Sequence, residues 1–156
     1  MGGKQSKNGF TLIEMVLVLL LVGLLAALVI PPSLTFFQTT RLNSASWQLL
    51  AVLRQAQTSA LNQKNDGAYG VYLDNNNYTF FKGTSYSSRD PSYDETYSWP
   101  RGIEAEGPTE IVFSKLSGSP QAAGEITLTN GFRATVIQIN SEGLISCNLN
   151  VSITTP

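Results

Sequence analysis

The stretch KNGFTLIEMVLVLLLVGLLAALVI, Lys7 to Ile30, decides how the chain begins to fold. From Phe10 to Ile30 it is apolar apart from Glu14, its only charged residue. As a helix this run measures about 31 Å, close to the hydrocarbon thickness of a bilayer. We therefore expect a membrane-spanning helix that carries one carboxylate within its apolar run.

Basic residues precede this run and then stop. Lys4 and Lys7 lie before it, and no Lys or Arg follows until Arg41. The positive-inside rule then predicts a single-pass protein with a cytoplasmic N-terminus and the rest of the chain outside the inner membrane. A cleaved signal peptide is the poorer alternative, because the run is too long and no A-x-A site follows it.

Glu14 is not explained by a plain membrane anchor. A carboxylate at the centre of a membrane helix costs about 2.5–3.5 kcal/mol on insertion scales, and less near the interface where Glu14 is expected. Such residues usually have a partner. In a bundle of apolar helices, one buried charge with one complementary partner sets the axial register, which apolar contacts alone leave undefined.

The residues GFTLIE, Gly9 to Glu14, followed by the apolar helix, resemble the class III leader junction of type IV pilins and type II secretion pseudopilins. This resemblance implies that residues 1–9 are a leader, and that prepilin peptidase cuts between Gly9 and Phe10. Phe10 then becomes the N-methylated first residue. It also implies that Glu14 faces the amine of a neighbouring subunit. Asn8 departs from the pattern, since a basic residue is common in that slot.

A second helical pattern follows the apolar run. Pro31 and Pro32 each lack a backbone donor and should kink the helix. We expect residues 10–37 to form the transmembrane or filament-core helix and residues 38–65 to form an amphipathic continuation that ends near Gly67 as C-cap. Apolar residues recur there at three- and four-residue spacing: Leu42, Ala45, Leu49, Val52 or Leu53, Ala56 and Ala60.

Residues 68–156 show the period-two pattern of strands. Six segments fit it: AYGVYLD, NYTFFKG, TEIVFSK, GEITLT, FRATVIQI and GLISCNL. DNNN and NSEG indicate turns, and TNGF predicts an Asn-Gly hairpin of type I′. The expected fold is α+β, in which one long N-terminal helix packs on an antiparallel β-sheet head (residues 38–156).

The C-terminal third, GEITLTNGFRATVIQINSEGLIS, is similar to the minor-pilin and H-type pseudopilin branch. The single Cys147 cannot close the disulfide loop of many major pilins, and the last 25 residues lack the acidic calcium loop of major pseudopilins. Both absences favour a minor subunit.

The segment from Gly83 to Gly102 is polar, and we expect a long loop there. It holds four candidate contact residues, Tyr86, Tyr93, Tyr97 and Trp99. Either these aromatic side chains contact another protein, or they fold back onto the sheet. Its three carboxylates, Asp90, Asp94 and Glu95, lack the spacing of a calcium loop, so no metal site is predicted.

Catalysis is not indicated, because the chain has no histidine and its lone cysteine lies in a predicted strand. No catalytic residue and no cofactor is predicted.

The resemblance implies a minor pilin or pseudopilin that primes or caps a type IV pilus or a type II secretion pseudopilus. Its partners would be other subunits, prepilin peptidase, the inner-membrane assembly platform and membrane lipid. The alternative is a minor pilin that takes up DNA or binds a surface. Nucleic acid is the poorer partner, since after loss of Lys4 and Lys7 eight basic residues face eleven acidic ones.

Overall fold

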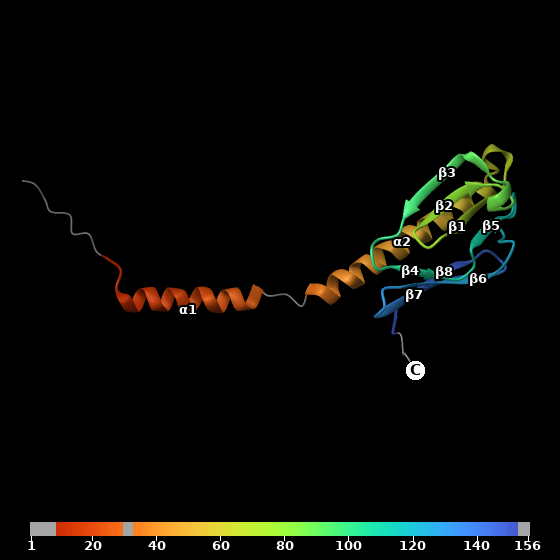
Figure 1. The fold of residues 1–156 in the computed structure, drawn as a ribbon. Coiled ribbons are helices and arrows are strands. Elements are labelled where there is room, and N and C mark those ends of the chain that lie inside the picture. Colours follow the sequence, from red (N-terminus) through yellow and green to blue (C-terminus); the bar gives the residue numbers. More distant parts are fainter. Residues whose placement is uncertain (1–8, 30–32, 153–156) are drawn as a thin grey trace, which may run out of the picture. The chain divides into compact units, whose positions relative to one another are not determined.

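The computed structural model describes residues 9–29 and 33–152, and the chain divides into two units between Phe36 and Phe37. Helix α1 spans Leu12–Val29 and helix α2 spans Ser33–Leu61 (Figure 1). The predicted kink residues Pro31 and Pro32 lie outside the described residues. No helix in the described part of the chain has the length and apolarity needed to cross a membrane.

Helix α2 ends at Leu61, four residues before the predicted end at Asn65. The backbone turns left-handed at Gln63 (φ 49°) and Asn65 (φ 51°), and residues Lys64–Asp66 form the short 3₁₀ helix η1. Asn tolerates this conformation because its short side chain bonds locally. Gly67 is extended (φ −143°), so it caps η1 and not the long helix.

The head contains two four-stranded antiparallel sheets where one sheet was expected. The first has the order β3-β2-β1-β5, with β1 at Tyr69–Leu73, β2 at Asn77–Lys82, β3 at Asp90–Ser98 and β5 at Glu110–Phe113. The second has the order β4-β6-β7-β8, with β4 at Glu104–Glu106, β6 at Gly124–Thr129, β7 at Arg133–Ile139 and β8 at Ile145–Ser152.

The predicted apolar stripe of α2 is the centre of the head. Leu42, Leu49, Leu53, Ala56 and Ala60 are each fully buried. They share one cluster with residues of both sheets, and Figure 1 shows α2 running between these sheets. The first sheet contributes Tyr69, Val71, Tyr78, Ile111 and Phe113, and the second contributes Ile126, Leu128, Ile137, Ile139 and Ile145. The α+β prediction is therefore confirmed.

The β6–β7 hairpin differs from the predicted type I′ turn. That turn needs positive φ at both central residues, but of Asn130 and Gly131 only Gly131 has it (φ 82°). The Asn130 Oδ1 atom accepts hydrogen bonds from the backbone N–H groups of Phe132 (3.0 Å) and Arg133 (2.8 Å). The side chain therefore holds the turn, which leaves Asn130 in an ordinary conformation.

Two loops are fastened to α2 by Gln57. Its Nε2 atom donates to the carbonyl oxygens of Gly118 (3.2 Å) and Gly143 (2.7 Å). Both glycines have positive φ, 61° and 86°. A Cβ atom on Gly143 would lie 2.7 Å from that same Nε2 atom, so the close approach requires glycine there.

We predict that Gln57→Ala lowers the free energy of unfolding by about 1–3 kcal/mol, because two partly buried carbonyls lose their donor. Chemical denaturation followed by tryptophan fluorescence measures this change. Gln55→Ala is the matched control, since the exposed Gln55 makes only a long bond of 3.4 Å to Glu95. Equal effects of the two substitutions would contradict the proposed role of Gln57.

Candidate assembly site

Thr11 caps the N-terminus of α1. Its Oγ1 atom accepts a hydrogen bond from the Glu14 backbone N–H (3.3 Å), and its carbonyl accepts one from the Met15 N–H (3.2 Å). The sequence TLIE thus has the Thr-x-x-Glu pattern of a capping box, with Glu14 at the position that favours a carboxylate near the positive end of the helix dipole. This local role of Glu14 was missed from the sequence, although the pattern was present there.

Helix α1 has no covering layer within the described part of its own unit. Every side chain from Phe10 to Ala26 is exposed, with Leu12 83% and Leu20 68% accessible. The Glu14 side chain is exposed too, and it makes no ion pair with any described residue. A helix that is apolar on all sides needs surrounding apolar material. Gly9, Phe10 and Glu14 therefore gather at one end of an uncovered apolar helix.

The segment from Gly83 to Gly102 is not the predicted loop. It contains the 3₁₀ turn η2 (Tyr86–Ser88) and the nine-residue edge strand β3. Tyr97 stacks on Tyr78 at 5.2 Å between ring centroids, and Trp99 packs on the same ring at 4.4 Å. The indole N–H of Trp99 donates to the Asp74 carbonyl at 2.9 Å. These two aromatic side chains fold back onto the first sheet.

The other two candidate aromatic residues, Tyr86 and Tyr93, also contact side chains of the head. Tyr86 stacks on Tyr72 at 3.9 Å and lies under the guanidinium of Arg89 at 3.8 Å, which in turn pairs with Asp94 at 2.7 Å. The Lys82 ammonium lies 4.5 Å from the ring centre of Tyr93. Internal packing thus accounts for all four side chains, and a role of this segment in binding stays a prediction.

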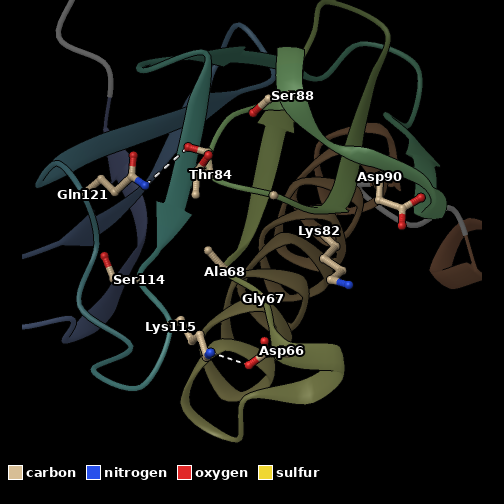
Figure 2. Close-up of a pocket in the computed structure, with 11 residues that line it drawn as sticks. Asp66, Gly67, Ala68, Lys82, Thr84, Ser88, Asp90, Ser114, Lys115 and Gln121 are labelled. Carbon is tan, nitrogen blue, oxygen red and sulfur yellow. Dashed lines mark hydrogen bonds and ion pairs between the residues drawn. The ribbon is translucent and has the colours of Figure 1, made fainter.

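The head also has a polar hollow of about 530 Å³ between η1, β2 and the segment after β5 (Figure 2). Its charged lining residues are Asp66, Lys82, Asp90 and Lys115. Lys115 pairs with Asp66, and this bond holds the pKa of Asp66 below its usual range. The Ser92 hydroxyl and N–H lower the pKa of Asp90. Two cations balance two carboxylates, so the hollow has no net charge that selects an anion or a cation.

Comparisons with known proteins bear on both units. Residues 4–30 match the prokaryotic N-terminal methylation motif. The solved structure of the minor pseudopilin EpsH from the Type 2 Secretion System of Vibrio cholerae is similar to this chain, with a TM-score of 0.54 at 10% identity. The likeness covers 70% of this chain and 97% of that one. No curated protein sequence matches.

The N-terminal segment thus carries a prokaryotic N-terminal methylation motif, and the fold is similar to that of a minor pseudopilin. The motif covers the predicted processing site, Gly9 and Phe10, as well as Glu14. The structural likeness covers the fold alone.

Within the head, Tyr78 is a buried titratable group that packs against Tyr97 and Trp99. Its hydroxyl has no hydrogen-bond partner among the described residues, and burial raises the pKa of Tyr78 to about 12. A raised pKa in the folded state favours the neutral phenol. This contribution to stability is complete below the ordinary value of 10 and is lost as the pH rises through about 12.

We predict that the free energy of unfolding falls between pH 10 and about 12, and that Tyr78→Phe makes this fall shallower. Denaturation curves at several pH values, with phenolate absorbance as a second signal, measure the effect. Tyr93→Phe is the control because Tyr93 is only partly buried, whereas Tyr78 is fully buried. A pH dependence unchanged by Tyr78→Phe would show that another group is responsible.

Proposed function

We propose that this chain is a minor pilin or pseudopilin, a structural subunit that primes or caps a type IV pilus or a type II secretion pseudopilus. The observation that carries the proposal is the processing motif on an apolar helix whose described side chains, up to Ala26, are all exposed. Such a helix needs two successive environments. It lies in the inner membrane as a precursor, and it joins the bundled helices of a filament after processing.

Prepilin peptidase removes residues 1–9 in this scheme, and Phe10 becomes the N-methylated terminus. The new amine of a neighbouring subunit is the partner for Glu14, whose carboxylate pairs with no described residue of its own chain. Because each apolar helix slides easily along the next, this ion pair sets the axial register. Loss of one partner leaves the other charge buried and unpaired, which costs about 3–5 kcal/mol.

The absence of a C-terminal disulfide supports a minor subunit rather than a major one. Cys147, the one cysteine of the chain, lies unpaired in β8, so no disulfide closes a C-terminal loop. The likeness of the fold to a minor pseudopilin agrees with this position. The partners are then other subunits, the inner-membrane assembly platform and, before assembly, membrane lipid. The head lies on the periplasmic or extracellular side.

The residues of the head give little support to the alternative function, a subunit that takes up DNA or binds a surface. After Gly102 the basic residues are Lys115 and Arg133, and Lys115 is paired with Asp66. The aromatic side chains proposed for contact pack against the sheet. The assembly function is therefore the one that the described residues favour.

Substitutions of Glu14 separate its two roles. Glu14→Gln removes the charge but keeps a residue that suits a capping box, whereas Glu14→Ala removes both. We expect both variants to lose incorporation into filaments, by about tenfold or more, because the amine of the neighbour loses its partner. Immunoblots of sheared filaments or of cross-linked pseudopili, normalised to membrane-bound protein, measure this loss.

Thr11→Ala is the matched control for the helix cap. It costs about 1 kcal/mol of helix stability but leaves the carboxylate in place, so it should reduce incorporation far less. If Glu14→Gln assembles as well as the native chain while Thr11→Ala fails, Glu14 acts as a cap and the register hypothesis is wrong.

Cleavage is tested separately by Gly9→Ala. Gly9 has open space around its Cα in the described structure, so the substitution does not disturb the fold. We expect the precursor to accumulate uncut, because the peptidase must bind the backbone closely at this position. A gel shift and N-terminal sequencing of the membrane protein measure processing. A mature variant that still begins at Phe10, formed as fast as from the native precursor, would contradict the assigned site.

A further inference from the structure

The sheet edges of the described head differ in how they are protected against pairing with another chain. An exposed edge strand offers unpaired N–H and C=O groups, and proteins usually blunt it with proline, charge, irregular pairing or a covering segment. Strand β3 has several of these devices. It contains Pro91 and Asp94, and its pairing with β2 is irregular between Phe80 and Lys82.

Two more edges are short or covered. The outer side of β5 is occupied, because Gln121 N–H donates to the Val112 carbonyl at 2.8 Å and Phe113 bridges to Pro120. Strand β4 has three residues, of which Glu104 and Glu106 are acidic. A strand of this length with two charges offers little to a partner.

Strand β8 lacks most of these protections. Its eight residues, ISCNLNVS, include no charge, no proline and no glycine. It lies at the end of its sheet with β7 as its neighbour. Residues Ile145–Asn148 pair with β7 without a break, and the register shift comes only after Asn148. Ser146 and Asn148 are exposed, so the accessible side chains of this regular part are uncharged.

We propose that the β8 edge pairs with β8 of a second copy of this chain. A free edge is recognised by another strand, which supplies the matching backbone donors and acceptors. Among the described edges of a second copy, β8 is the one that is long and uncharged, with a regular part at Ile145–Asn148, whereas β3 and β4 are acidic. Two β8 strands meet without like-charge repulsion, and one patch serves both partners, as a two-fold interface requires.

This pairing joins two sheets into one continuous eight-stranded sheet. It concerns the head alone, so it does not depend on Glu14, on cleavage or on the proposed place in a filament.

Cysteine cross-linking of the full-length chain tests the pairing. In a Cys147→Ser background, Ser146→Cys places a thiol at the middle of the regular part of β8, and Ser98→Cys places one at the exposed end of β3 as the matched control. Strand neighbours lie about 4.5–5.5 Å apart, within disulfide range. After mild oxidation of the membrane-inserted protein, we expect a disulfide-linked dimer from Ser146→Cys and little from Ser98→Cys. Both variants keep α1, so contacts through that helix affect them equally.

A charge placed on the edge gives the second measurement. Asn148→Lys in the Ser146→Cys protein should lower the dimer yield about fivefold, because like charges opposite each other are destabilising. Its melting temperature should not change, since Asn148 is exposed. Equal cross-linking at Ser146→Cys and Ser98→Cys, a yield insensitive to Asn148→Lys, or linkage only to a different protein would each overturn the proposal.

Discussion

The head depends on the burial of one helical stripe between two sheets. Each fully buried leucine on α2 contributes about 1.5–3 kcal/mol from the removal of apolar surface. Ala45, Ala56 and Ala60 lie on the same stripe as the leucines and are buried with them. Both sheets share the main core on this helix, and the first sheet has in addition a small separate cluster of Ala68, Phe81 and Val112. The Gln57 contacts to Gly118 and Gly143 extend this arrangement by tying two loops to the same helix.

Short-range periodicity explains what could be predicted of this head. The stripe of α2 and six strands were predicted because their apolar residues repeat at fixed spacing. Strand β3 was missed because DPSYDETYS carries two aromatic residues among polar ones and begins beside a proline. Its pairing with β2 is fixed by tertiary contacts, such as Tyr97 on Tyr78. Strand β4 is three residues long, which is too short for any period.

The two candidate sites also differ in whether the sequence alone could locate them. Gly9, Phe10 and Glu14 could be predicted because they lie in a linear motif, and Thr11 lies in that motif as well. The polar hollow was not found, because its lining comes from residues far apart in the sequence, such as Asp66 and Lys115. Only the folded chain brings these charges together. The net charge of the chain does not show which charged residues lie next to each other, so the pair of Asp66 and Lys115 could not be predicted from it.

The cap on α1 bears on how one carboxylate can serve two purposes. Thr11 satisfies the backbone N–H of Glu14, so the helix end does not consume the Glu14 carboxylate. In the proposed scheme, cleavage after Gly9 would leave Thr11 as the second residue, so the cap would survive processing. In the proposed membrane-inserted precursor, the helix dipole would offset part of the cost of a carboxylate near the interface. After the proposed processing, the same carboxylate would remain free to pair with an amine from outside its own chain. If the Glu14 carboxylate itself were needed to cap the helix, it would have to leave the cap before it could pair with an amine of another chain.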